Sequence, residues 1–452
     1  MKNFSVVVLA AGAGKRMRSS LPKVVHRLSG KPLIKWVIDS VSVLKPDNLV
    51  LVLGWCAKSV ECFLSDDSNI KIVYQKEQLG SGHALLQAER ILGNYKGDIL
   101  VLNADVPLIK SSVLLSLVEN NRKTGASATV LVVRTSDPFG YGRIVAENDK
   151  YVEKIVEEKD ATSEERQIKK INSGVYCFDE NLWRALLKLK SNNVKKEYYL
   201  TDTVTILREL GKKVSSIIVE DSCEVKGINT REELSEVESA LKERKIKELL
   251  DNGVSIIDTS NVYISYDAKI GMDSVIYPGV FIDTDVSIGK NCVIKGSSYI
   301  KNSRIGDASV ISYSYVQDAV VDERVKIGPF SHIRQNSILN ENVKVGNFSE
   351  IKQSVISGNS EVNHLSYIGD AQVGKNVNVG AGTIVCNYDG IKKHETIIGS
   401  RSFIGSNVNL VAPVEIGEDV FIAAGSTITH DIPSEKFAIA RARQEIKEKE
   451  GL

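Results

Sequence analysis

Residues 398–428 read IGSRSFIGSNVNLVAPVEIGEDVFIAAGSTI, and an aliphatic side chain occupies every sixth position of this stretch. The aliphatic residues are Ile398, Ile404, Leu410, Ile416, Ile422 and Ile428. A fixed period this short is typical of a solenoid, in which each repeat contacts only its neighbours and stacked coils bury a continuous core. Three such six-residue sides close one triangular coil, with each aliphatic side chain directed toward the axis. The stretch therefore predicts a β-helix of hexapeptide repeats.

The same period extends back through the C-terminal half of the chain. Further runs are Ile264, Ile270, Ile276, Ile282, Ile288, Ile294 and Ile300; Val321, Ile327, Ile333, Leu339, Val345 and Ile351; and Val373, Val379, Val385 and Ile391. Between Val385 and Ile398 the register slips and the polar stretch Cys386–Thr396 intervenes. We expect residues 253–452 to form a left-handed parallel β-helix, with a loop at this break where function tends to lie.

Residues 1–230 follow a different pattern, in which short apolar strands alternate with segments of helical spacing. Expected strands are Val6–Ala10, Leu49–Leu53, Ile70–Tyr74, Ile99–Asn103 and Ala128–Val133, and expected helices include Ile34–Leu44 and His83–Leu92. The alternation predicts a doubly wound, Rossmann-like α/β sheet that binds ligands at the carboxyl ends of its strands. Residues 231–252 are charged, contain neither Gly nor Pro, and precede Gly253. They predict a linker helix between the two domains.

The composition indicates a cytoplasmic protein. The chain carries 58 Lys and Arg against 57 Asp and Glu, and the net charge of +1 points to neither nucleic acid nor a membrane surface as a partner. No apolar run approaches the roughly 18 residues that a membrane span needs, and the strand Val6–Ala10 is too short for a secretion signal. The six cysteines are scattered, which fits reduced thiols.

Two features of the N-terminal half indicate a phosphate site. The strand Val6–Ala10 leads directly into Ala11-Gly12-Ala13-Gly14-Lys15-Arg16, and Lys23 follows soon after. Glycines let backbone N–H groups approach a phosphate, and the basic side chains add charge; a tight turn is the alternative for the glycines alone. Asp105 follows a later apolar strand and is placed to hold Mg²⁺ on a triphosphate, although a helix N-cap is the alternative.

Polar residues in the C-terminal half cluster around the breaks in the repeat. They are Arg334, Lys352, His364, Tyr367, Asn378, Asn387, Tyr388 and Lys393. Considered alone, a single histidine on a solenoid is more often a surface residue than a catalytic one.

Motifs along nearly the whole chain resemble one enzyme family. In order they are LAAGAGKRM (9–17), LPK (21–23), QKEQLGSGHA (75–84), DVPL (105–108), GYGRI (140–144), IVEEKDA (155–161), INSG (171–174), EYYLTD (197–202) and HLSYIGD (364–370). The chain is similar to the bifunctional N-acetylglucosamine-1-phosphate uridyltransferases/glucosamine-1-phosphate acetyltransferases. The resemblance implies acetyl transfer from acetyl-CoA to glucosamine-1-phosphate, and then uridylyl transfer from UTP with release of pyrophosphate. It also implies UDP-N-acetylglucosamine as product, Mg²⁺ as cofactor and a homotrimer.

Position by position, the resemblance assigns residues to the uridyltransferase site. Those that contact the nucleotide and its phosphates are Leu9, Ala10, Ala11, Gly12, Arg16, Lys23, Gln75, Gly80 and Ser81. Those that contact the sugar are Gly142, Glu157 and Asn172, with Asp105 and Asn229 holding Mg²⁺. The family usually has Tyr-Gly before this aspartate, whereas this chain has Asn103-Ala104, so the sugar contact expected at Asn103 departs from the family pattern.

The resemblance assigns the acetyltransferase site in the same way. His364 becomes the base that takes the ammonium proton, a role that suits a histidine near neutral pH. The sugar phosphate is assigned to Arg334, Lys352, Tyr367, Asn378 and Asn387, and acetyl-CoA to Ala381, Asn387, Tyr388, Ser406, Ala424 and Arg441. Because Arg441 follows the last repeat residue, Ile428, and also Pro433, we expect a tail that leaves its own coil and reaches a neighbouring subunit.

Three alternatives compete with this assignment. One is a single-function sugar nucleotidyltransferase whose β-helix oligomerises or regulates, as in glucose-1-phosphate adenylyl enzymes. A second is a three-histidine metal site like that of γ-type carbonic anhydrases, but His332, His364 and His394 are 32 and 30 residues apart, which is not a whole number of 18-residue coils. The third, a purely structural solenoid, does not explain the N-terminal phosphate loop.

Overall fold

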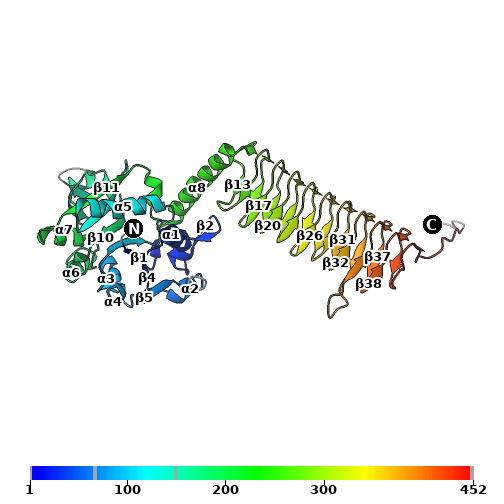
Figure 1. The fold of residues 1–452 in the computed structure, drawn as a ribbon, viewed down its shortest axis with the longest axis horizontal. Helices are drawn as coiled ribbons and strands as arrows, with labels where there is room; N and C mark the ends of the chain where they lie inside the picture. Colours follow the sequence, from blue (N-terminus) through cyan, green and yellow to red (C-terminus); the bar gives the residue numbers. More distant parts are fainter. Residues whose placement is uncertain (1–2, 65–68, 147–149, 448–452) are drawn as a thin grey trace. The chain divides into compact units, whose positions relative to one another are not determined.

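The chain forms two compact units in the computed structural model, which describes residues 3–64, 69–146 and 150–447. The units are Met1–Ala240 and Leu241–Leu452. In Figure 1 the first is an α/β unit coloured blue to green, and the second is a stack of coils coloured green to red. No helix in the described part of the chain is both long enough and apolar enough to cross a membrane.

A nine-stranded mixed sheet forms the centre of the first unit. Its main path runs β11 (Val214–Val219), β7 (Ala128–Arg134), β10 (Lys170–Phe178), β6 (Asp98–Asn103), β1 (Phe4–Ala10), β4 (Leu49–Leu53) and β5 (Ile70–Tyr74). β8 (Arg143–Ala146) and β9 (Val152–Val156) form a hairpin that joins at β10. β10 runs antiparallel to β6 and β7, whereas β1 is parallel to β4 and β6. The expected α/β sheet is therefore confirmed, with one antiparallel strand in its main path.

Alternate residues of β1 face opposite cores, which places helices on both faces of the sheet. Val6 and Val8 belong to one apolar cluster, while Val7 and Leu9 belong to the other. The first cluster includes residues of α1 (Leu33–Ser42), α2 (Ala57–Glu61) and α5 (Ser111–Thr124). The second includes residues of α3 (Ser81–Leu86), α4 (Glu89–Leu92), α6 (Asn181–Leu186) and α7 (Asp202–Glu209). The single helix expected over His83–Leu92 is wrong, because the structure divides it into α3 and α4.

Three parallel sheets form the second unit as the sides of a β-helix. The first sheet has eleven strands, from β12 (Ser255–Ile256) to β41 (Phe437–Ala438). The second has ten strands, from β13 (Tyr263–Ile264) to β40 (Thr427–Ile428). The third has nine strands, from β14 (Lys269–Ile270) to β38 (Val414–Ile416). The β-helix of hexapeptide repeats is therefore confirmed.

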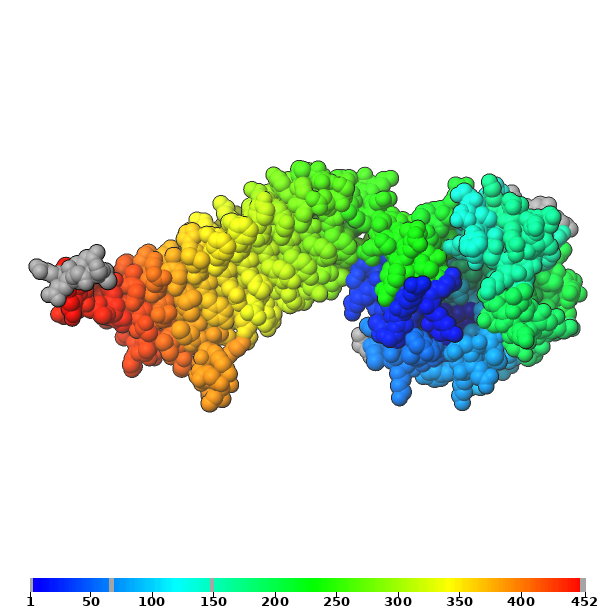
Figure 2. Space-filling view, turned by 180° about the vertical axis from the view of Figure 1, so that it is seen from behind, coloured from blue at the N-terminus to red at the C-terminus, as the bar shows by residue number. Residues whose placement is uncertain are grey.

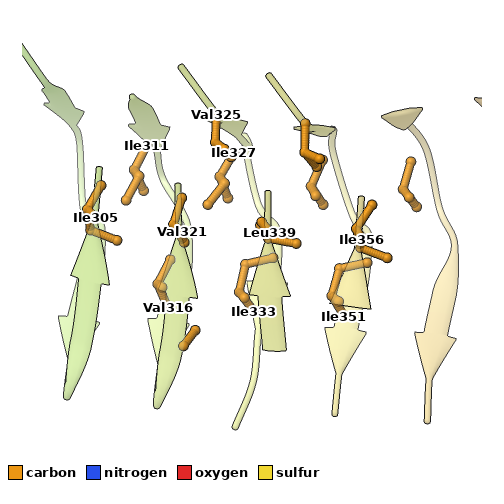
Figure 3. Close-up of a cluster of buried hydrophobic side chains, with 14 of the residues drawn as sticks. Ile305, Ile311, Val316, Val321, Val325, Ile327, Ile333, Leu339, Ile351 and Ile356 are labelled. Carbon is orange, nitrogen blue, oxygen red and sulfur yellow. The ribbon is translucent and has the colours of Figure 1, made fainter. Parts of the chain in front are cut away.

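The aliphatic residues of the repeat form the core of these coils. Figure 3 shows Ile311, Val316 and Val321, among others, extending into the space between the strands. Ile333 pairs with Ile351 of the next coil, and both side chains are fully buried. Two of the breaks between runs reflect shorter coils, since Ile300 pairs with Val316 and Ile351 pairs with Ile368.

One member of the predicted repeat is misplaced. Ile391 is 90% exposed and lies in the loop that follows β34 (Ile384–Cys386). This loop is held by a bridge between Tyr388 and Lys393, and it projects from the coils in Figures 1 and 2, where it is orange. The six-residue spacing of Ile391 is therefore coincidental, and its side chain takes no part in the core.

Helix α8 (Arg231–Asp251) belongs to both units. In its first half, Glu238 accepts a hydrogen bond from the backbone N–H of Ser29. In its second half, Ile246 and Leu249 join the core of the β-helix. Lys242 Nζ also donates to the carbonyl oxygen of Ser260, at 2.9 Å, in the first coil. The C-terminal half of α8 thus covers the apolar end of the first coil.

Candidate active sites

A cavity of about 550 Å³ lies at the carboxyl ends of β1 and β6, where a doubly wound sheet is expected to bind ligands. Most of the predicted nucleotide residues line it: Leu9, Ala10, Ala11, Gly12, Lys23, Gln75, Gly80, Ser81, Asn103 and Asp105. Arg16 lies elsewhere, in a cavity of about 370 Å³ that Glu157 also lines. The structure therefore places Arg16 beside a predicted sugar residue rather than in the larger cavity.

Two glycines of this cavity have backbone conformations that other residues rarely adopt. Gly14 has φ of +60°, and a Cβ atom there would lie 2.6 Å from Lys23 Cβ. Gly80 has φ of +113°, and a Cβ atom there would lie 2.6 Å from the carbonyl oxygen of Tyr198. Because these glycines have no Cβ atom, the backbone at Gly14 can lie close to Lys23 and the backbone at Gly80 close to Tyr198. The phosphate-loop hypothesis requires such glycines. Tyr198 belongs to the EYYLTD motif, so this motif packs directly against the nucleotide loop.

At the edge of this cavity, side-chain oxygens of Asp105 and Asn229 both contact the Lys23 ammonium. Lys23 Nζ donates to Asp105 Oδ2 in a short contact, and to Asn229 Oδ1 at 2.8 Å. The Asp105 backbone oxygen also accepts from the Ile228 N–H at 2.9 Å, which fixes the two segments together. Asp105 is not the N-cap of α5, whose N-cap is Lys110. Mg²⁺ in proteins usually binds one or two carboxylates and completes its coordination shell with water and phosphate oxygens. The Asp105 carboxylate and the Asn229 amide oxygen, which both contact the Lys23 ammonium, fit such a site.

The predicted sugar residues lie close together in the first unit. A Cβ atom on Gly142 would lie 3.6 Å from Asn172 Cβ and 3.7 Å from Glu157 Oε1. Burial raises the pKa of Glu157, while a hydrogen bond from the Thr201 hydroxyl opposes that rise. Tyr176 Oη accepts from Asn172 Nδ2 at 2.6 Å. Thr201 and Tyr176 thus orient the two polar side chains, and we did not predict either of these residues.

His364 begins a column of residues along one corner of the β-helix. Its carbonyl oxygen accepts from the N–H of Gly382, and one coil further on Ala381 O accepts from Asn407 N. Ser406 O accepts from Gly425 N, and Ala424 O accepts from Arg441 Nη1 at 2.8 Å. The corner therefore brings together His364 and the predicted acetyl-CoA residues Ala381, Ser406, Ala424 and Arg441.

Asn347 holds the His364 ring and was missed in the sequence. His364 Nδ1 lies 2.7 Å from Asn347 Oδ1. Because a carbonyl oxygen only accepts, this contact requires the proton on Nδ1 and leaves Nε2 as the unprotonated nitrogen of the neutral ring. Asn347 lies 17 residues before His364, which is about one coil, so the coil spacing was a signal that could have found it.

Two of the predicted phosphate residues, Arg334 and Lys352, lie at the ends of successive strands of the second sheet. Arg334 follows β25 (His332–Ile333), and Lys352 ends β28 (Glu350–Lys352). The Lys393 ammonium, followed by burial, lowers the pKa of Lys352. Adjacent ammonium groups favour an anion between them.

Asn387 lies with this group, whereas two other predicted residues do not. Asn387 Nδ2 donates to Asp370 Oδ2 in a short contact, and to Tyr367 Oη at 3.3 Å. Asn378 lies on β33 (Asn378–Val379) in the first sheet, on a different side of the coil. Tyr388 lies in the projecting loop, with its hydroxyl donating to the Gly390 carbonyl at 2.6 Å.

The C-terminal tail leaves the coil later than expected, because the chain pairs with its own coil as far as Ala440. β41 (Phe437–Ala438) pairs with β39 (Phe421–Ile422), and Ala440 O accepts from Thr427 N at 3.0 Å. The chain therefore completes another turn of its own coil after Pro433. Arg441 lies over Ala424 of the same subunit, which removes the reason for assigning Arg441 to a neighbour's site.

The three histidines of the proposed metal alternative each have a separate neighbour. His364 contacts Asn347, His394 Nε2 lies 2.6 Å from Asp389 Oδ2, and the ring of His332 packs edge-on against Tyr315. Among the described residues there is no group of three or more His, Cys, Asp or Glu side chains that could hold a metal ion.

The α/β unit and the hexapeptide coils belong to a nucleotidyltransferase joined to a hexapeptide-type transferase. Residues 5–225 match the nucleotidyl transferase family model, and residues 395–430 match the bacterial transferase hexapeptide model. Residues 259–319 match the GMPPB C-terminal domain. A crystal structure of UDP-glucose pyrophosphorylase with UDP-glucose covers 54% of this chain and all of its own, at 19% identity and a TM-score of 0.45.

Relatives of known family match the whole chain. The bifunctional protein GlmU of Acetivibrio thermocellus is 46% identical, over 99% of this chain and 97% of its own. That of Caldanaerobacter subterraneus subsp. tengcongensis is 47% identical over the same shares, and that of Shouchella clausii is 46% identical over 98% of each chain. The chain belongs to the family of bifunctional GlmU proteins. The expected uridyltransferase and acetyltransferase that together make UDP-N-acetylglucosamine are confirmed by this membership, and the single-function alternative is set aside.

Proposed function

We propose that uridylyl transfer takes place in the 550 Å³ cavity of the first unit. The observation that supports this is the convergence of Asp105 and Asn229 oxygens on one cation beside the glycine-rich loop. These two residues would hold Mg²⁺, which when bound neutralises and orients the triphosphate. A phosphate oxygen of N-acetylglucosamine-1-phosphate attacks the α-phosphorus of UTP, the bond to the bridging oxygen breaks, and pyrophosphate leaves.

In this proposal the protein contributes position and charge, and no covalent nucleophile is needed. Backbone N–H groups of the loop from Ala11 to Gly14 and the Lys23 ammonium bind the phosphates. Glu157 and Asn172 hold the sugar, one as a hydrogen-bond acceptor and the other as a donor. Arg16 lies on the Glu157 side, and there it binds the phosphate of the incoming sugar more readily than the triphosphate.

We propose that acetyl transfer takes place at the His364 corner of the second unit. His364 Nε2 takes a proton from the glucosamine ammonium, and the free amine attacks the thioester carbonyl. The carbon–sulfur bond breaks, the acetyl group passes to nitrogen, and coenzyme A leaves as the thiol after it receives a proton. Coils in a β-helix are spaced like strands in a sheet, at about 4.8 Å. The four coil steps from His364 to Arg441 therefore span about 19 Å, a length suited to an extended cofactor arm.

A homotrimer would complete this second site. Asn378 lies on the first sheet, whereas Lys352 and Tyr367 lie on the second, so we infer that an Asn378 contact to the sugar phosphate comes from another copy of the chain. The loop that carries the exposed Ile391 offers an apolar contact for such a copy. Closed symmetric assemblies are the usual form of homo-oligomers. For the trimer that the family resemblance implies, light scattering should give three times the chain mass. We also assign the protein to the cytoplasm, where reduced thiols are stable, because all six cysteines are unpaired.

The test assays both half-reactions on two purified variants. Asp105→Ala should lose UDP-sugar formation and keep acetylation, and His364→Ala should do the reverse. A chelator should stop pyrophosphate release and leave thiol release unchanged. If either folded variant loses both activities, the separation of the two sites is wrong.

A further inference from the structure

The Lys23 ammonium lies where the proposed metal ion would bind. It donates to Asp105 Oδ2 and, at 2.8 Å, to Asn229 Oδ1. Mg²⁺ binds the same kind of oxygen at about 2.0–2.1 Å. Both side chains of the ion pair are largely buried, with 13% of Lys23 and 15% of Asp105 exposed. Two cations therefore cannot share these oxygens, because the second would meet the full repulsion of the first in a poorly solvated place.

Lys23 can leave this position without leaving the cavity. Its backbone is packed against Gly14, where an added Cβ would lie 3.4 Å from the Lys23 backbone nitrogen. The same cavity is lined by Lys23, by Asp105 and by the loop from Ala11 to Lys15. A lysine side chain is a flexible four-carbon stem with a single charge at its end. Rotation about that stem can carry the ammonium from Asp105 to an anion bound at the loop.

We propose that Lys23 is a resident counter-cation, which Asp105 and Asn229 exchange for the divalent ion, and that the released ammonium turns to the nucleotide phosphates. The inference rests on the proposed metal role of Asp105 and Asn229. The exchange of the Lys23 ammonium for the metal ion makes metal binding and nucleotide binding cooperative. The metal alone has to displace the lysine, whereas with nucleotide present the displaced lysine gains a new partner. By reciprocity, the nucleotide must strengthen metal binding by the same factor.

The first measurement uses Mn²⁺ as the probe ion, without nucleotide, on the full-length protein, with free Mn²⁺ determined by electron paramagnetic resonance. Lys23→Met keeps the length of the side chain and removes the competing cation. Because that variant no longer has to break a charge-assisted hydrogen bond, it should bind Mn²⁺ about tenfold more tightly than the wild type. Circular dichroism and thermal unfolding, compared with the wild type, show that the variant is folded.

Lys15→Met is the matched control. It removes the same charge from the same cavity, but the charge-assisted hydrogen bonds to Asp105 and Asn229 come from Lys23. Its Mn²⁺ affinity should change by less than about threefold, as expected for an exposed charge in water. If Lys15→Met and Lys23→Met strengthen Mn²⁺ binding equally, the effect is one of net charge and the exchange is wrong.

The second measurement compares UTP affinity in chelator and in saturating Mn²⁺, by calorimetry. In chelator Lys23 is held by Asp105, so Lys23→Met should change UTP affinity by less than about twofold, whereas in Mn²⁺ it should weaken UTP about tenfold. Equal losses under both conditions would show that Lys23 always serves the nucleotide, and would overturn the exchange. Asp105→Asn separates the two levels of inference: if it binds Mn²⁺ as well as the wild type, the metal assignment itself fails.

Discussion

Removing the Thr201 hydroxyl tests how the sugar carboxylate is held. Thr201 is 4% exposed, and its Oγ1 donates to Glu157 Oε1 at 3.0 Å. Thr201→Val keeps the shape of the side chain and removes this donor. A hydrogen bond to a charged group contributes about 1.5–3 kcal/mol. Glu157 keeps some contact with solvent, so we take the lower end of that range, which corresponds to roughly a tenfold loss in affinity for the sugar phosphate.

The same substitution should change the pH dependence of the reaction. Burial raises the pKa of Glu157; the Thr201 hydroxyl and Lys195 lower it, and Asp160 and Glu197 raise it. Loss of the hydroxyl therefore raises the pKa further. In the proposed role the carboxylate accepts hydrogen bonds from the sugar, so kcat/KM falls as pH drops through the pKa. In Thr201→Val that fall should begin at a higher pH than in the wild type.

The assay follows pyrophosphate release while N-acetylglucosamine-1-phosphate is varied at saturating UTP. KM for the sugar phosphate should rise about tenfold and KM for UTP should stay the same. Thr201→Ser restores a hydroxyl and should recover most of the loss. An unchanged KM and acid limb in Thr201→Val, together with a large effect of Glu157→Gln, would refute the positioning role of Thr201. An ineffective Glu157→Gln would instead refute the assignment of Glu157.

Three further substitutions test other parts of the molecule. Asn347→Leu should slow thiol release from acetyl-CoA at least about tenfold, because His364 loses the acceptor that fixes its tautomer, whereas Asn347→Asp should keep most of the activity. Gly14→Ala should abolish UTP binding in calorimetry and leave acetylation intact, since φ of +60° and the 2.6 Å contact with Lys23 both oppose a side chain. Ile351→Ala should lower the unfolding free energy of the β-helix by about 2–5 kcal/mol in urea, without loss of uridylyl transfer.

The core of the β-helix could be predicted because stacked coils turn spatial neighbours into a fixed sequence spacing. Ile333 and Ile351 are 18 residues apart and pair in adjacent coils. The same spacing wrongly included Ile391, because periodicity alone does not separate a coil side from an inserted loop. The Asp389-Gly390 pair before Ile391, a turn signal, and the two lysines after it were the local warning.

The backbone conformation of the glycine-rich loop was also predictable, whereas its role in phosphate binding stays a prediction. Glycines beside basic residues indicated the phosphate loop, and Gly14 has the positive φ that this requires. Thr201 and Tyr176 were missed because each acts through a hydrogen bond to a side chain from another segment of the fold, with no spacing rule to reveal it. The tail was misread because Pro433 was taken as the end of the coil, although the chain pairs again at Phe437.

The way α8 covers the first coil has a consequence for how such molecules behave in a crowded solution. A solenoid grows by adding identical rungs, so an uncovered last rung is a template on which another molecule can continue, and the outcome is a filament. Ile246 and Leu249 occupy the place where that next rung would begin. One helix therefore joins the two enzymes and also limits the solenoid to a finite length.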